Sequence, residues 1–143
     1  MTTTTTENVP VPASHLDLLE RPIYAIVTTV MPDGQPQSTV VWVNYDGEHV
    51  LVNTARGRQK DKNLKLNPRI TVALIDPENP FRWLEVRGIA EVTEEGGVEH
   101  IEALSRKYTG QGYYGGFNTR TTPETETRVK VTIHATKVLA FGQ

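Results

Sequence analysis

β-branched and apolar residues form runs separated by short polar turns along the first half of the chain, a pattern typical of antiparallel strands. Three such strands are expected, at 23–30, 37–45 and 50–54. Asp-Gly pairs lie between them at 33–34 and 46–47, and this dipeptide favours tight hairpin turns. The pattern therefore predicts a three-stranded antiparallel meander.

The second half of the chain continues the pattern with longer runs. Strands are predicted at 70–75, 81–92 and 128–141, and the last of these alternates apolar and polar side chains with the period of a half-buried strand. Gly88 lies inside the middle run, where a glycine commonly marks a bulge or a sharp bend. About six strands of this kind predict a mainly β protein that forms a small antiparallel barrel.

Helices are expected only in short segments between these strands. One precedes the first strand and ends at Pro22, a second covers 57–66, and a third begins at Thr93 and carries apolar residues at helical spacing. Residues 1–12 are rich in Thr and Pro and are expected to be disordered. The remaining residues, 13–143, are expected to form a single domain.

Composition narrows the classes of function. The chain has 143 residues and a net charge of −2, which gives one core of ordinary size and no overall attraction for nucleic acid. It has no cysteine, so disulfides, thiolate nucleophiles and cysteine-bound metals are excluded. The four histidines show no spacing typical of a metal site. No apolar run approaches the roughly 20 residues of a membrane span, and the Thr-rich start lacks the features of a signal peptide, so a cytoplasmic location is expected.

The segment from Asn53 to Leu64 carries the strongest chemical signal. The strand ends at Thr54, the chain breaks at Gly57, and four cations occupy alternate positions: Arg56, Arg58, Lys60 and Lys62. The first turn of the helix predicted here offers free backbone N–H groups, and Arg and Lys beside it suit a phosphate. The alternative is an ordinary solvated basic face. We interpret the segment as a phosphate-binding turn.

Three sequence blocks occur in the order and at the spacing of a known family. They are Pro32-Asp33-Gly34-Gln35-Pro36-Gln37, then Asn53-Thr54-Ala55-Arg56-Gly57-Arg58-Gln59-Lys60 with Asn63-Leu64 and Asn67-Pro68-Arg69, and Trp83-Leu84-Glu85-Val86-Arg87-Gly88. Over residues 14–141 the chain resembles the pyridoxamine 5′-phosphate oxidase-like split β-barrel flavoproteins, particularly the branch that uses the deazaflavin coenzyme F420. The resemblance implies a six-stranded antiparallel split β-barrel that forms a homodimer and holds its cofactor at the subunit interface.

The resemblance also implies a set of cofactor-binding residues. The second strand would contact the ring through its backbone, Arg58 and Lys60 would hold the phosphate, and Trp83 would contact the ring bound to the partner subunit. The full set is Ser38, Thr39, Val40, Val41, Trp42, Asn53, Thr54, Arg56, Arg58, Gln59, Lys60 and Trp83. Trp42 also has an alternative role as a core residue. The further cations Arg56, Lys62 and Arg128 would suit the polyanionic oligoglutamate tail of F420.

The function that follows is a reductase that transfers a hydride from reduced F420 to a small conjugated acceptor. FMN is the alternative cofactor, in an oxidoreductase of the pyridoxamine-phosphate-oxidase-like type. A second class of function is a non-catalytic carrier that binds a flavin or a tetrapyrrole in the same groove. A nucleic-acid binder is disfavoured, because no aromatic platform accompanies the cations. No catalytic side chain and no metal are expected, since the cofactor itself carries the hydride.

Residues 109–125 form a long segment without periodicity. The first part of this segment combines four glycines with the aromatic residues Tyr113, Tyr114 and Phe117. Glycines permit motion and aromatic rings offer flat apolar faces, so one hypothesis is a lid that covers the cofactor ring and excludes water. The alternative is an ordinary solvated loop.

Overall fold

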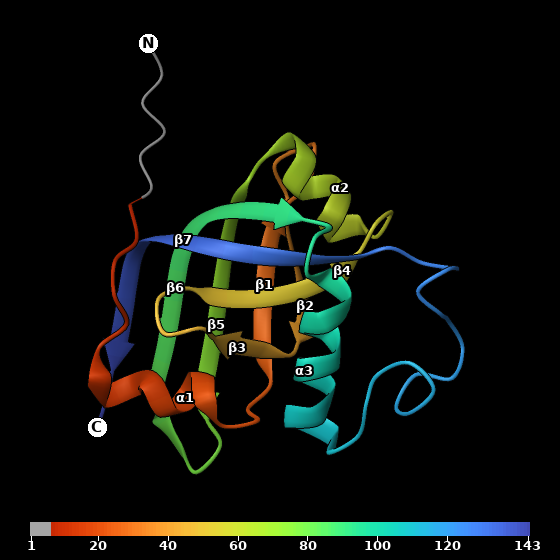
Figure 1. Cartoon of the computed structure of the whole chain (residues 1–143). Helices are drawn as coiled ribbons and strands as arrows, with labels where there is room; N and C mark the ends of the chain where they lie inside the picture. The colour runs from red at the N-terminus through yellow and green to blue at the C-terminus, as the bar shows by residue number, and fades with distance from the viewer. Residues whose placement is uncertain (1–6) are drawn as a thin grey trace.

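The computed structural model describes residues 7–143. Seven strands form one antiparallel sheet, in the order β2-β1-β5-β6-β7-β4-β3, and the sheet curls into a half-barrel (Figure 1). The strands are β1 Ala25–Val30, β2 Pro36–Val41, β3 Val43–Tyr45, β4 Val50–Ala55, β5 Arg69–Asp76, β6 Asn79–Thr93 and β7 Arg128–Phe141. The helices are the 3₁₀ turn η1 Ala13–His15, α1 Leu16–Glu20, α2 Gln59–Leu66 and α3 Gly97–Thr109. The predicted class, a mainly β split barrel, is confirmed.

The sheet has seven strands rather than the predicted six because the run 37–45 is divided at Trp42. β2 pairs with β1 at one end of the sheet order, and β3 pairs with β4 at the other. The single bend at Trp42 therefore connects the two edges of the sheet and helps to close its curvature. A run of β-branched residues does not reveal such a bend, because both halves keep the strand pattern.

β6 and β7 are the longest strands, with 15 and 14 residues, and they pair with each other along most of their length. Their register shifts between Arg87 and Gly88, as expected for the bulge or bend predicted at this glycine. A Cβ atom on Gly88 would lie 2.3 Å from the backbone oxygen of His134, so no larger residue fits without moving β7. The irregularity lets the long pair follow the curvature of the barrel.

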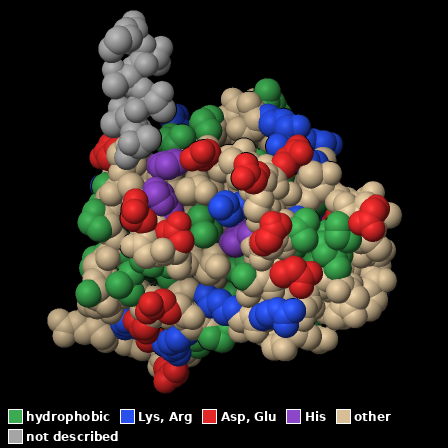
Figure 2. Space-filling view, in the orientation of Figure 1, with side chains coloured by type: hydrophobic (Ala, Val, Ile, Leu, Met, Phe, Trp, Pro, Cys, Tyr) green, Lys and Arg blue, Asp and Glu red, His purple; other side chains and the backbone are tan. Residues whose placement is uncertain are grey.

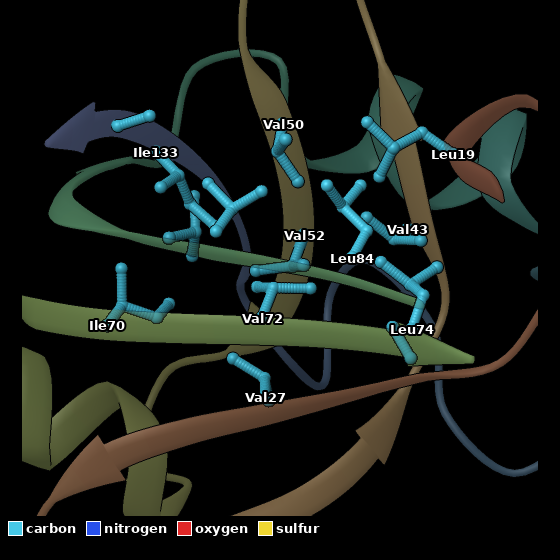
Figure 3. Packing of buried hydrophobic residues seen from close by; sticks show 14 of the residues in the cluster. Leu19, Val27, Val43, Val50, Val52, Ile70, Val72, Leu74, Leu84 and Ile133 are labelled. Atoms are coloured by element: carbon cyan, nitrogen blue, oxygen red, sulfur yellow. The ribbon is translucent and has the colours of Figure 1, made fainter. Parts of the chain in front are cut away.

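The core fills the inside of the curled sheet (Figure 3). Inward and outward positions alternate along β1 and β5, as expected for strands with one face on a core. Side chains from strands that are far apart in sequence meet there, among them Val27, Val43, Val52, Val72, Leu84 and Ile133, each at most 1% exposed. Leu18 and Leu19 of α1 close one end of this cluster.

The N-terminal segment differs from the expectation of disorder. Val9 donates a backbone hydrogen bond to Ala135 of β7 at 2.9 Å, and Val11 is buried in the core. The side chain of Asn8 also donates to the backbone oxygen of Glu48. The prediction was wrong for this part, because composition does not show that these residues bond to β7 and pack on the core. Its remainder, residues 1–6, lies outside the described residues.

α3 begins later than predicted. β6 continues through Thr93, and the helix starts at Gly97, after Gly96 with φ of +79°. A Cβ atom on Gly97 would lie 2.1 Å from the backbone oxygen of Arg128, so the glycine pair brings the helix into direct contact with β7. None of the helices found between residues 7 and 143 is long and apolar enough to cross a membrane.

Candidate functional site

A cavity of about 260 Å³ lies where the β2–β3 corner, β4, the first turn of α2, α3 and the start of β7 meet. One part of its lining is apolar and aromatic, and the other part is cationic. The lining residues are Tyr24, Val40, Val41, Trp42, Asn53, Arg58, Lys60, Ile101, Leu104, Tyr113, Phe117 and Arg128. Figure 2 shows Lys and Arg side chains gathered at the end of the molecule where α2 lies.

The aromatic wall is centred on Trp42, at the bend between β2 and β3. Its ring stacks on Tyr108 of α3, with 5.5 Å between centroids and 15° between planes. Phe117 and Tyr113 meet it edge-on, at 5.1 Å and 6.3 Å. The Tyr108 hydroxyl is fixed in turn, because it donates to the backbone oxygen of Ile23 at 2.6 Å. The cavity therefore has a flat, supported wall of the kind that a planar ring system packs against.

The cationic wall consists of Arg58, Lys60 and Arg128. Lys60 is half-buried, and its pKa is lowered by burial first and then by the charges of Arg58 and Arg128. Within residues 7–143, neither Arg58 nor Lys60 has an acidic side chain at salt-bridge distance. An anion in this cavity would relieve both the desolvation and the repulsion.

Arg128 is held rigidly in the wall, with only 4% of its side chain exposed. Its Nε donates to the carboxylate of Glu126 at 3.0 Å, and its Nη2 donates to the hydroxyl of Tyr113. The guanidinium also lies 4.8 Å from the centroid of the Tyr113 ring. Glu126 is thus the one carboxylate that balances this group of three cations within the described chain.

The turn before α2 depends on Asp61, whose side chain is fully buried. Its carboxylate accepts the backbone N–H of Gly57 at 2.9 Å and Nη1 of Arg56 at 2.9 Å. Arg56 also donates to Glu94 at 3.0 Å. Arg56 is therefore an ion-paired residue of the turn and does not line the cavity, whereas Arg58 and Lys60 on the same turn do.

Several residues of the predicted binding set meet at the cavity. Val40, Val41 and Trp42 come from the β2 end, and Asn53, Arg58 and Lys60 come from β4 and the turn that follows it. The phosphate-binding turn inferred from sequence thus lies beside the strand that was expected to contact the ring. The cavity brings the two parts of the set together, although they are far apart along the chain.

Other members of the set lie outside the cavity lining. Ser38 shares a hydrogen bond with Thr28, and Gln59 donates to Asn63 at 2.8 Å. The hydroxyls of Thr39 and Thr54 are buried without a hydrogen-bond partner in the described structure. Trp83 stacks on Phe141, with 5.6 Å between ring centroids. Trp83 lines neither of the two cavities that contain Arg58.

Part of the lining was not in the predicted set. Ile101 and Leu104 face the cavity from α3, and their helical spacing was the available signal. Tyr24 lies just before β1, and nothing in the local sequence distinguishes it from any other residue that flanks a strand. Arg128 was considered only for a cofactor tail, although it forms part of the main wall.

Residues 109–125 form an ordered wall. The carboxylate of Glu102 on α3 accepts the backbone N–H groups of Tyr113 and Tyr114, at 2.9 Å and 3.0 Å. Phe117 stands at the exposed end of this wall, with 54% of its surface accessible. The segment also encloses a second cavity of about 350 Å³, lined by Arg58, Tyr113, Phe117, Asn118, Thr119, Arg120, Thr121 and Glu126. Arg58, Tyr113 and Phe117 line both cavities, so the two lie next to each other.

A network of polar side chains supports the cavity from behind Asn53. The amide nitrogen of Asn53 donates to the backbone oxygen of Gly97 at 3.0 Å and lies 3.1 Å from Nδ1 of His100. The other ring nitrogen of His100 lies 2.9 Å from Oδ1 of Asn44. Burial, with a smaller contribution from the charge of Lys130, lowers the pKa of His100 to about 4. His100 is therefore neutral near pH 7.

Comparison with known proteins agrees with this architecture. Residues 11–140 match the family model described as pyridoxamine 5′-phosphate oxidase. The structure of an F420 reductase is 34% identical over 90% of this chain and 98% of that chain, with a TM-score of 0.77. A conserved hypothetical protein of Mycobacterium tuberculosis is 26% identical over 98% of this chain and 89% of its own, with a TM-score of 0.73.

A more distant neighbour shows the fold alone. The Group A Streptococcus protein HupZ is 22% identical over 92% of this chain and 94% of its own, with a TM-score of 0.64. The family match and the F420 reductase together support an oxidoreductase of the flavin or deazaflavin type. They confirm the resemblance inferred from the three sequence blocks: the chain belongs to the pyridoxamine 5′-phosphate oxidase-like family.

Proposed function

We propose that this protein is a reductase that binds reduced F420 and delivers its hydride to a small conjugated acceptor. The observation that carries the proposal is the cavity in which Arg58, Lys60 and Arg128 face a flat wall built on Trp42. Cations that lack enough carboxylate partners suit a phosphate, and the aromatic wall suits a planar ring. A flavin-like cofactor carries both a phosphate and a planar ring in one molecule, so it matches both parts of the cavity.

Each part of the cavity has a role in this proposal. Arg58 and Lys60 bind the phosphate with charge-assisted hydrogen bonds. β2 is an edge strand that pairs only with β1, so backbone groups beside Val40 and Val41 remain available to the polar edge of a ring. The bound cofactor supplies the hydride, and the protein binds it, orients it and excludes water. No side chain of the cavity needs to act as an acid or a base for the transfer itself.

The second cavity favours F420 over FMN. FMN ends at its phosphate, whereas F420 continues beyond it into a chain of carboxylates. Arg58 lines both cavities, so a ligand whose phosphate is bound at Arg58 has an adjoining space to enter. Arg120 lines that space, and no acidic partner for its side chain occurs between residues 7 and 143. The 34% identity to an F420 reductase supports the same choice.

We further propose that the functional unit is a homodimer. Large apolar side chains are exposed on the outer face of the sheet, including the cross-strand pair Ile26 and Val40, the latter with 63% of its surface accessible. Ile75, Trp83 and Phe141 lie side by side on β5, β6 and β7 and extend this surface. A partner that covers this face would bury the patch. Trp83 would then be available to the cofactor bound to the other subunit.

Separate titrations of the purified protein with F420 and with FMN test the choice of cofactor. We expect F420 to bind more tightly than FMN, and the protein loaded with reduced F420 to reduce a small conjugated acceptor. A protein that purifies with FMN and does not bind F420 would overturn the choice of cofactor. Tight retention of either ligand without turnover on any electron acceptor would instead indicate a non-catalytic carrier. Sedimentation of a monomer at micromolar concentration would contradict the shared site.

A further inference from the structure

His100 is buried on the inner side of α3, with 7% of its surface exposed, and does not line the cofactor cavity. An amide nitrogen only donates, so Nδ1 of His100 accepts the hydrogen bond from Asn53. The other ring nitrogen, Nε2, then carries the hydrogen and donates to Oδ1 of Asn44 at 2.9 Å. The imidazole is thus held in one neutral tautomer by partners on both sides.

This arrangement uses both hydrogens of the Asn53 amide, one on His100 and one on the backbone oxygen of Gly97. The amide oxygen is therefore directed at the remaining neighbour, Nη1 of Arg128, at 3.5 Å. If the amide were turned over, its oxygen would face the Gly97 oxygen, which is repulsive in every case, and also the lone pair of His100 in its present tautomer. Gly97 and His100 together therefore fix the orientation of Asn53 from behind the cavity wall.

The fixed orientation of Asn53 affects the cationic wall of the cavity through Arg128. Its guanidinium is held by Glu126, by the hydroxyl of Tyr113 and by the oxygen of Asn53, each on a different nitrogen. Two of these contacts lead back to α3, because Glu102 holds the backbone N–H of Tyr113 and His100 holds the amide of Asn53. Only the route through Asn53 and His100 continues to β3, at Asn44. A change at His100 would reach Arg128 along this route, through Asn53.

We propose that His100 is a positioning residue for the cofactor site. Its unprotonated Nδ1 orients the Asn53 amide, and Asn53 in turn holds Arg128 in the geometry that binds an anion. The inference rests on the proposed function, because it assigns His100 a role in cofactor binding. It also makes a claim about the ligand-free protein, namely the tautomer of His100 and the order of the Arg128 side chain.

Paired substitutions separate positioning from packing. His100→Asn keeps an acceptor oxygen near the place of Nδ1, whereas His100→Leu keeps bulk and loses the acceptor. We expect His100→Leu to weaken binding of F420 roughly three- to tenfold, the usual effect of one hydrogen bond, and His100→Asn to weaken it less. In an Asn53→Ala background, His100→Leu should have no further effect. Equal affinities for His100→Leu and wild type, or fully additive losses in the double variant, would overturn the proposal.

Nitrogen NMR of the ligand-free protein makes the test independent of cofactor binding. We expect wild-type His100 to show hydrogen on Nε2 and a lone pair on Nδ1. The Arg128 Nε–H signal should be sharp in wild type and in His100→Asn, and broadened in His100→Leu. Hydrogen on Nδ1, or an unchanged Arg128 signal in folded His100→Leu, would refute the proposal. If neither F420 nor FMN binds the wild-type protein, the proposed function fails, and the NMR signals of His100 and Arg128 still decide the role of His100. If His100→Leu does not fold, the tautomer of His100 in wild type and the affinity of His100→Asn for F420 decide that role.

Discussion

Two clusters of charge in this molecule differ in how completely they are balanced. Near α1, the guanidiniums of Arg21 and Arg82 lie among the carboxylates of Asp17, Asp76 and Glu78, with distances of 3.2 Å from Arg21 to Asp17 and 3.0 Å from Arg82 to Asp76. In the cavity, by contrast, only Arg128 of the three cations has a carboxylate partner, Glu126. Within the described chain, every cation of the first cluster is thus paired with a carboxylate, whereas Arg58 and Lys60 in the second are not.

The pKa shifts in the two clusters reflect this difference. The pKa of Asp17 is lowered, chiefly by its hydrogen bond from Arg82, so the charged form of the carboxylate is favoured where it stands. The pKa of Lys60 is lowered as well, first by burial and then by the charges of Arg58 and Arg128, and for a lysine this means that the charged form is disfavoured. A balanced cluster holds the fold together, whereas an unbalanced one is prepared for an anion from outside.

The largest expected effect concerns the neutral group behind the unbalanced cluster. The pKa of His100 is lowered to about 4 in the folded protein, whereas an unfolded histidine titrates near 6.5. Unfolding therefore takes up a proton between these values, and stability falls as pH falls through that window, by up to about 3 kcal/mol. Denaturant unfolding from pH 7 to pH 4 should show a shallower loss for His100→Asn than for wild type. Parallel curves would contradict the prediction.

The next effect falls on the cations themselves. Arg58→Ala and Lys60→Ala should each weaken cofactor binding by about 1.5–3 kcal/mol, the value typical of a charge-assisted hydrogen bond. The thermal stability of each variant should be unchanged or slightly higher than that of wild type, because the substitution removes one of two cations that repel each other. Calorimetric titration measures the affinity. Lys62, which was expected from the sequence to suit the cofactor tail, is exposed on the same helix and lines neither cavity, so Lys62→Ala is the matched control. An unchanged affinity in both test variants would place the phosphate elsewhere.

A smaller effect is expected at the aromatic wall. Phe117 contacts Trp42 edge-on at 5.1 Å and is the exposed member of the wall. Phe117→Ala should reduce turnover roughly two- to tenfold, the range of one aromatic contact, and reduce cofactor affinity less, because the phosphate contacts are untouched. Steady-state kinetics beside a binding titration would show this split. An equal loss of turnover and of cofactor affinity would show that Phe117 acts in binding, and would contradict a role in covering the cofactor ring.

The smallest effect belongs to the balanced cluster. Asp17→Asn removes one carboxylate from a group that is partly exposed, with 42% of the Asp17 side chain accessible. The expected loss of stability is below about 1 kcal/mol, and cofactor affinity should not change. Thermal unfolding and a cofactor titration on the same sample give both values. A loss of cofactor affinity in Asp17→Asn would mean that the two clusters are coupled, and would contradict the view that the cluster near α1 serves stability alone.

Local patterns predicted most of the fold, because the strands are rich in β-branched and apolar residues and the first two hairpins carry Asp-Gly turns. They missed the bend at Trp42 and the packing of Val9 and Val11, which depend on contacts with distant strands. They also placed the start of α3 too early. That boundary is set by the close approach of Gly97 to Arg128, 31 positions along the chain.

The site was predictable only in part for the same reason. The basic turn can be recognised from the local sequence, but the sequence does not distinguish the role of Arg56 from that of Arg58. Their roles differ because Glu94, far along the chain, pairs with Arg56, while Arg58 faces a cavity built by α3 and β7. The resemblance to a family supplied the residues of β2 and the turn. The support given by His100 and the wall position of Arg128 required the three-dimensional contacts.

The titration of Lys60 tests the central claim most directly, because the claim is that the cavity lacks negative charge until a phosphate binds. Carbon NMR of the Lys60 side chain, followed against pH, would compare the free protein with the protein saturated with F420. We predict that the pKa of Lys60 lies below the ordinary value of a lysine in the free protein, because of burial and of the charges of Arg58 and Arg128, and that it rises when F420 binds. If the pKa of Lys60 has the ordinary value in the free protein and does not respond to saturating F420, the cavity is not the phosphate site.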